Sequence, residues 1–152
     1  MRCIILILMV KNRCERYLSK HLKQSKSFYL KLQTNQLCFK TNPADYLVFK
    51  FAKRFLVECK ECNGKYFDPR RLTQEGDLKN FVNYNTSYDK PYNGAYILLL
   101  FWNKSLKKSN LFLININKFL WAKENCEKKF FKLDYCIKTF DKVSFNEVFS
   151  LL

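Results

Sequence analysis

The chain has 152 residues, a length typical of one compact domain that can bury a core. Hydrophobic residues make up 48% of it and aromatic residues 17%, a composition that excludes intrinsic disorder. The 28 lysines and arginines outnumber the 13 acidic residues, giving a formal net charge of +15. Such a surplus favours a polyanionic partner, nucleic acid ahead of an anionic membrane surface. We therefore expect a single domain over residues 1–152.

The N-terminal segment, Met1 to Val10, contains an apolar run that is far shorter than the roughly 20 residues needed to span a bilayer. No small-residue cleavage site follows it, as a signal peptide would require. Residues 1–8 are expected to form an extra N-terminal strand or to precede the true start at Met9. We expect no membrane association and a cytoplasmic location, in the host cytoplasm if the protein is viral.

The seven cysteines are an odd number and are scattered along the chain, which favours a reducing compartment over a disulfide framework. Cys59 and Cys62 form a C-x-x-C pair. A zinc site would need a second pair or a histidine cluster, and His21 is the only histidine. Zinc is therefore a minor alternative.

The first predicted element is a helix over residues 11–26. Cys14, Tyr17, Leu18, His21 and Leu22 recur at the three- and four-residue spacing of one buried stripe.

The remaining elements follow from alternation, apolar runs and turn residues. Strands are predicted at 28–38, 46–51, 54–60, 95–102 and 111–116. The second and third of these are close enough to form an antiparallel hairpin. Helices are predicted from Thr73, as N-cap, to Tyr84 and over 117–125. Between them, residues 91–94 are expected to interrupt regular secondary structure. Residues 126–152 are a C-terminal extension, expected to hold a strand and a terminal helix.

Two carboxylates and a lysine lie on the predicted hairpin. Asp45 opens its first strand, and Glu58 and Lys60 share one face of its second. Antiparallel pairing brings the two carboxylates to the same end of the sheet, where they suit Mg²⁺, which takes one or two carboxylates plus waters and phosphate oxygens. Lys60 would orient the attacking water or offset charge in the transition state.

Two further residues flank this hairpin. Glu15 lies at the edge of the first helix's buried stripe, so its carboxylate could face the domain and bind metal; the alternative is a solvated side chain paired with Lys11 or Ser19. Gln74 opens the second helix, either beside the site or without a specific role. Glu-x-Lys alone is usually a solvated ion pair, and it is the combination, in this order, that favours catalysis.

At these residues the sequence resembles the PD-(D/E)xK nuclease superfamily and, within it, the small Holliday junction resolvases of the archaeal and RecU-like types, over roughly residues 11–125. The resemblance implies an α/β, restriction-endonuclease-like domain with a central mixed β-sheet flanked by helices. It further implies that Glu15, Asp45 and Glu58 bind Mg²⁺, with Mn²⁺ as a substitute. Lys60 would assist hydrolysis, and Gln74 would contact the metal-bound water or a DNA phosphate. The family acts as a homodimer on branched DNA such as four-way junctions.

The basic charge would hold the DNA backbone against such a site. The residues expected to do so are Lys11, Arg13, Lys65, Arg70 and Arg71. Tyr66 and Phe67 are expected to stack on an unpaired base.

The sequence thus predicts a metal-dependent, structure-selective DNA endonuclease, foremost a Holliday junction resolvase. The alternatives are a repair or restriction-like nuclease of the same superfamily and a non-catalytic basic nucleic-acid-binding domain. In the latter, Glu58 and Lys60 would form only a structural ion pair.

Overall fold

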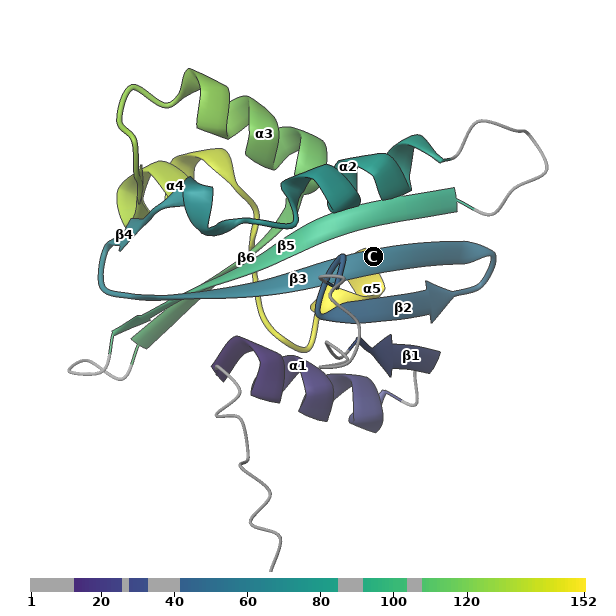
Figure 1. Ribbon diagram of the computed structural model, residues 1–152. Helices are drawn as coiled ribbons and strands as arrows, with labels where there is room; N and C mark the ends of the chain where they lie inside the picture. The colour runs from purple at the N-terminus through teal and green to yellow at the C-terminus, as the bar shows by residue number, and fades with distance from the viewer. Residues whose placement is uncertain (1–12, 26–27, 33–41, 85–91, 104–107) are drawn as a thin grey trace, which may run out of the picture.

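The computed structural model describes residues 13–25, 28–32, 42–84, 92–103 and 108–152 (Figure 1). Residues 1–8 and Lys11 lie outside this part of the chain. The helices are α1 (Arg13–Gln24), the 3₁₀-helix η1 (Pro69–Arg71), α2 (Glu75–Asn83), α3 (Ile116–Asn125), α4 (Leu133–Thr139) and α5 (Val148–Leu151). The strands are β1 (Phe28–Lys31), β2 (Tyr46–Lys50), β3 (Lys53–Asn63), β4 (Tyr66–Phe67), β5 (Tyr92–Asn103), β6 (Lys108–Asn115), β7 (Phe131–Lys132) and β8 (Lys142–Val143).

Six strands form one mixed sheet in the order β1-β2-β3-β5-β6-β8. β3 and β5 are parallel, and the other neighbours are antiparallel. Parallel neighbours need a crossover, and α2 lies in the connection between β3 and β5. The predicted α/β architecture with a central mixed sheet flanked by helices is therefore confirmed.

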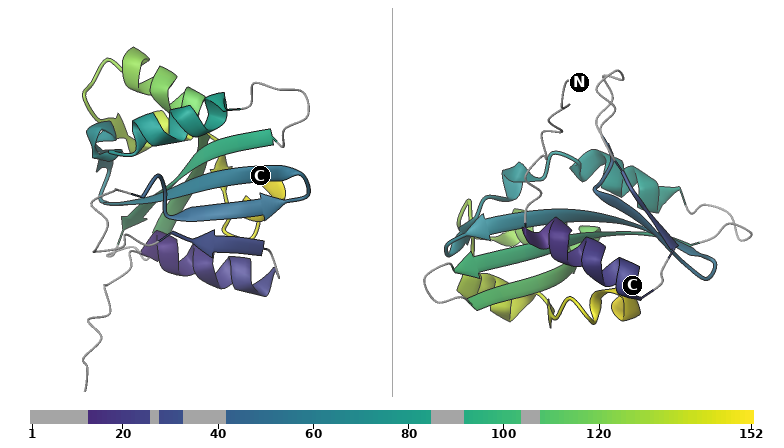
Figure 2. Two further views of the ribbon diagram at one scale, coloured as in Figure 1. Left: turned by 45° about the vertical axis from the view of Figure 1, so that its right-hand side comes forward. Right: turned by 90° about the horizontal axis from the view of Figure 1, so that it is seen from below.

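Helices cover both faces of the sheet (Figures 1 and 2). One core contains Leu78 of α2, Phe119 of α3 and Cys136 of α4. The other contains Leu18 of α1 and Val148 of α5. Because strand side chains alternate between faces, each long strand contributes to both cores.

The predicted antiparallel hairpin of β2 and β3 forms, but its turn is Phe51 and Ala52, one residue before the predicted turn at Ala52 and Lys53. Phe51 has a positive φ of 53° and is 98% exposed. β3 continues to Asn63, beyond the predicted end at Lys60, because its parallel pairing with β5 extends to Trp102.

Residues 92–94 belong to a strand, so the predicted interruption of secondary structure at 91–94 is wrong for these three residues. β5 begins at Tyr92 and passes through Gly94, which pairs with Phe55 of β3. A Cβ on Gly94 would lie 2.7 Å from Cδ1 of Phe55, so the glycine makes room for that buried ring. Gly94 therefore serves packing within a strand and does not mark a turn.

Helices α1 and α2 lie where they were predicted, with two differences. Tyr17 is half exposed and packs on Phe145 with 5.2 Å between ring centroids, so it is not part of the buried stripe. The N-cap of α2 is Gln74 and not Thr73, and it makes no side-chain capping bond.

The C-terminal residues 126–152 are an integral part of the domain. They form β7, α4, β8 and α5, more elements than the strand and helix predicted. β8 pairs with β6 at the edge of the sheet, and Phe140 packs in the core beside α4. None of the helices in the described segments is long and apolar enough to cross a membrane.

Candidate active site

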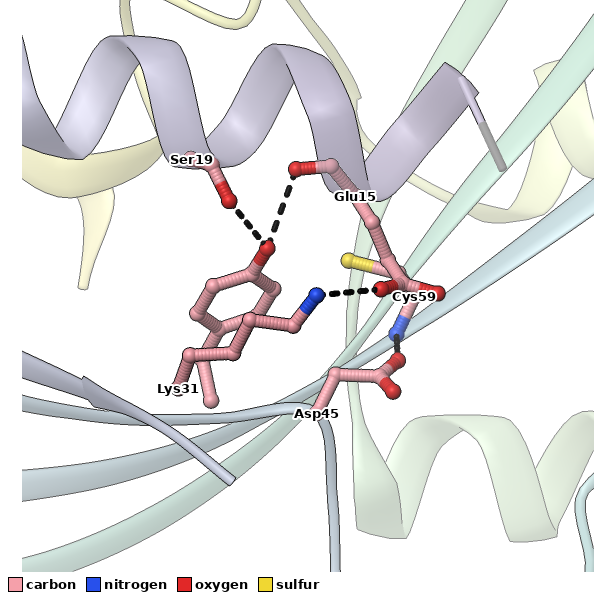
Figure 3. Close-up of polar contacts among 6 residues, drawn as sticks. Glu15, Ser19, Lys31, Asp45 and Cys59 are labelled. Carbon is pink, nitrogen blue, oxygen red and sulfur yellow. Dashed lines mark hydrogen bonds and ion pairs between the residues drawn. The ribbon is translucent and has the colours of Figure 1, made fainter. Parts of the chain in front are cut away.

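The β2–β3 register brings Asp45 and Glu58 together. The strand pairing ends with Tyr46 opposite Val57, so Asp45, which precedes β2, and Glu58 come next in the same register. Residues directly opposite each other in an antiparallel pair have Cβ atoms about 5 Å apart. Oδ2 of Asp45 also accepts a hydrogen bond of 2.7 Å from the backbone N–H of Cys59, which fixes its carboxyl against β3 (Figure 3).

Glu58 is a buried carboxylate that is only half satisfied. It is 2% exposed, and its Oε1 forms an ion pair of 2.7 Å with Nζ of Lys60. Its Oε2 is buried and has no hydrogen-bond partner among the described residues. A buried oxygen without a partner costs free energy, and either a proton on the adjacent Asp45 and Glu58 carboxyls or a cation beside them would relieve it.

The pKa values of Asp45 and Glu58 are both raised, because the two carboxyls are buried close to each other. Burial, followed by repulsion from Asp45, raises the pKa of Glu58 to about 7, although Lys60 opposes the shift. Burial also raises the pKa of Asp45, with a contribution from Glu15, while the Cys59 hydrogen bond opposes it. Two adjacent carboxylates resist ionising together unless a cation offsets their charge.

Lys60 and Gln74 complete the predicted set on this face. Nζ of Lys60 donates to Oε1 of Gln74 at 3.4 Å, and the lysine side chain is 16% exposed. Thr73 donates to the same Gln74 oxygen at 3.1 Å. The 2.7 Å ion pair with Glu58 positions the ammonium of Lys60, and Gln74 adds a longer contact to it.

Glu15 approaches the site from α1. Its carboxylate forms an ion pair of 3.1 Å with Nζ of Lys31, and its charge contributes to the raised pKa of Asp45 (Figure 3). The Glu15 side chain is 17% exposed and its partner is Lys31; Lys11, one of the two partners named in the solvated alternative, lies outside the described residues. The structure thus brings Glu15 near Asp45, with its carboxylate engaged by a lysine.

Two residues that support Glu15 were missed in the sequence. The hydroxyl of Tyr46 donates to the backbone oxygen of Glu15 at 3.0 Å and contacts the hydroxyl of Ser19, which anchors α1 over the sheet. Lys31 is brought to Glu15 by its pairing opposite Tyr46 in the β1–β2 ladder. No local sequence signal marks Lys31, because its role depends on the pairing of β1 with a strand distant along the chain.

A divalent cation at this site would have few protein ligands. Within the described segments, no group of three or more histidine, cysteine, aspartate or glutamate side chains is placed to hold a metal ion. Asp45 and Glu58 offer two carboxylates, and Oε2 of Glu58 is a buried acceptor without a hydrogen-bond partner among the described residues. Mg²⁺ is commonly bound in this way, keeping several waters in its coordination sphere.

The C-x-x-C pair does not form a zinc site. Cys59 packs in the core beneath α1, whereas Cys62 packs in the core on the opposite face of the sheet. One ion cannot bind both thiols.

The predicted DNA-binding residues differ in their availability. Arg13 is held by Glu61 at 2.6 Å and lies 4.9 Å from the centroid of the Trp102 ring. Arg70 pairs with Asp68 at 2.7 Å. Lys65 is exposed and forms no salt bridge with any described residue.

Arg71, Phe67 and Tyr66 also differ in how accessible they are to a nucleic acid. The guanidinium of Arg71 lies 5.5 Å from the ring centroid of Phe67. Phe67 is fully buried, so the expectation that it stacks on a base is wrong. Tyr66 is 58% exposed, so part of its ring is accessible to such a contact.

No family model matches the chain, and a search of curated proteins finds no similar sequence.

Proposed function

We propose that the protein is a Mg²⁺-dependent DNA endonuclease with a restriction-endonuclease-like fold and, within that class, a Holliday junction resolvase. The proposal depends on one observation: Asp45, Glu58 and Lys60 converge on one face of a hairpin, and Glu58 keeps a buried oxygen without a partner among the described residues.

The order of elements supports the proposal. A helix with Glu15 precedes the strand pair with Asp45 and the Glu-x-Lys segment, and a helix opened by Gln74 follows. The superfamily that the sequence resembles has its site residues in this order. In this chain Glu15 lies near Asp45 and forms an ion pair with Lys31, whereas Glu58 and Gln74 are linked to each other through Lys60.

The chemistry assigns a role to each residue. Asp45 and Glu58 would hold Mg²⁺, which, when bound, polarises the scissile phosphate and lowers the pKa of a water. The ammonium of Lys60 orients the attacking water or offsets negative charge that develops on the phosphate. Gln74 adds a 3.4 Å hydrogen bond to that ammonium. Glu15 and Lys31 form a neutral pair that positions α1 against the site.

The substrate follows from charge and symmetry. A net charge of +15 supplies affinity for any phosphate backbone. Resolving a four-way junction takes two symmetric cuts, which a two-fold homodimer would provide. A nuclease acting on other DNA would share the site but would not need to be a homodimer.

One observation favours a second function. The 2.7 Å ion pair between Glu58 and Lys60 is complete without any metal. In a non-catalytic, basic nucleic-acid-binding domain this pair would only stabilise the sheet.

Cleavage assays separate these functions. A synthetic four-way junction and a linear duplex of the same sequence are incubated with Mg²⁺ or EDTA and with the wild type, Asp45→Asn or Lys60→Ala. A matched control is Glu75→Gln, which removes a carboxylate of α2 that forms a 2.6 Å ion pair with Lys123 of α3. We expect symmetric, Mg²⁺-dependent nicks in the junction, lost in the first two variants and kept in the third.

Other outcomes reassign the protein. Equal cutting of junction and duplex would replace the resolvase with a general nuclease. Tight DNA binding without metal-dependent cutting of either substrate would leave the non-catalytic domain.

A further inference from the structure

A small second sheet joins two distant parts of the chain. β4 pairs with β7, so that Tyr66 lies opposite Lys132 and Phe67 opposite Phe131. Phe67 and Phe131 are fully buried, whereas Tyr66 is 58% exposed. The pair of Tyr66 and Lys132 therefore forms the outer face of this ribbon, with Nζ of Lys132 lying 5.8 Å from the ring centroid of Tyr66.

A hollow of about 370 Å³ lies beside this face, between the end of α3 and the start of α4. Lys128, Phe130 and Lys132 line it, and Phe130 is 42% exposed. The volume is within the range of about 300–1,000 Å³ found for ligand sites. We call Tyr66, Lys128, Phe130 and Lys132 the β4–β7 patch.

The charges of this patch are not neutralised. Lys128 and Lys132 form no salt bridge with a carboxylate of the described residues, and neither do the adjacent Lys65 and Lys129. A close polar contact with Lys132, with repulsion between the two ammonium groups, lowers the pKa of Lys128. Glu127 also lines the hollow and opposes this shift. Lysines without a carboxylate partner favour an anion beside them.

Exposed rings next to unpaired lysines are the two components of a site for single-stranded nucleic acid. Bases stack on the rings, and the lysines contact the phosphates. A duplex keeps its base faces covered, so the exposed rings favour an unpaired strand.

We propose that the β4–β7 patch binds an unpaired strand of DNA. The choice of DNA rests on the proposed function. β3 rises about 3.3 Å per residue, so Asn63 at its end lies roughly 17 Å from Glu58. β4 follows directly, and the patch would hold the strand a few nucleotides from the cutting site.

The test is binding measured in EDTA, by fluorescence anisotropy of a labelled oligothymidine of about 12 nucleotides and of a duplex of equal length. Tyr66→Leu with Phe130→Leu removes the stacking faces and keeps the apolar bulk. Lys128→Gln with Lys132→Gln removes the charges. The control is Tyr92→Leu with Lys53→Gln, because Nζ of Lys53 also lies over the exposed Tyr92 ring, at 5.6 Å, at the other end of the sheet.

We expect the double leucine variant to bind the single strand about tenfold or more weakly than the wild type. The double glutamine variant should reduce the slope of log affinity against log salt by about 1.4. The control should bind as the wild type does. Patch variants that bind like the wild type, a control that loses as much affinity, or an equal loss for duplex would overturn the inference.

Cleavage by the same proteins keeps the two proposals apart. Asp45-dependent cutting by a protein whose patch variants bind normally would refute the patch alone. Loss of single-strand binding in the patch variants of a protein that never cuts would refute the nuclease and retain the patch.

Discussion

The raised pKa of Glu58 makes the stability of the metal-free protein fall as pH rises. The pKa of this carboxyl is 4.5 in the unfolded chain and about 7 in the folded protein. Between these values the folded state binds more protons than the unfolded state, so the free energy of unfolding decreases with pH until Glu58 is ionised in both states. At about 1.36 kcal/mol per pKa unit, the full decrease is about 3 kcal/mol.

Glu58→Gln should remove this decrease. We expect the free energy of unfolding of the wild type, relative to that of the variant, to fall by about 2–3 kcal/mol between about pH 5 and about pH 8. Urea unfolding followed by circular dichroism in EDTA measures both proteins at each pH. The difference between the two proteins cancels the titration of groups that do not interact with Glu58, and it includes any change in the titration of Asp45.

Glu75→Gln is the matched control, because its carboxylate is a third exposed and paired with Lys123. Its free energy of unfolding should follow that of the wild type at both pH values. A Glu58→Gln variant whose stability runs parallel to the wild type would refute the argument. So would a wild type that gains stability relative to this variant as pH rises.

Further predictions concern the packing that supports the site. Gly94→Ala would place a Cβ 2.7 Å from the Phe55 ring and should lower the free energy of unfolding by about 1–3 kcal/mol. Gly76→Ala meets open space in α2 and should be neutral or stabilising. Denaturant titration of both variants tests this. Phe131→Ala should destabilise the fold by about 3–5 kcal/mol because the Phe131 ring is fully buried. Phe130 is 42% exposed, so Phe130→Ala should destabilise it much less. The melting temperatures of the two variants measure the difference.

The sequence predicted the elements whose signals are local. The stripe of α1, the β2–β3 hairpin and the apolar runs of β5 and β6 lie where periodicity placed them. Gly94 was misjudged because a glycine that makes room for Phe55 looks the same in sequence as one in a turn. β7 and β8 are two residues each, and their pairing is set by tertiary contacts that no local pattern shows.

The candidate site shows the same division. Alternation along β3 placed Glu58 and Lys60 on one face, and the register of the hairpin placed Asp45 beside them. Lys31 was missed because its contact with Glu15 depends on the β1–β2 register. Phe67 was misassigned because exposure within a two-residue strand depends on which face meets the core.

The central claim is that Asp45 and Glu58 together hold one divalent cation. Titration of Mn²⁺ followed by electron paramagnetic resonance tests it without any DNA. We predict that the wild type and Glu75→Gln bind a single Mn²⁺, displaced by Mg²⁺, and that Asp45→Asn and Glu58→Gln each lose it. Mn²⁺ binding that is absent from the wild type, or unchanged in both of these variants, would contradict the account.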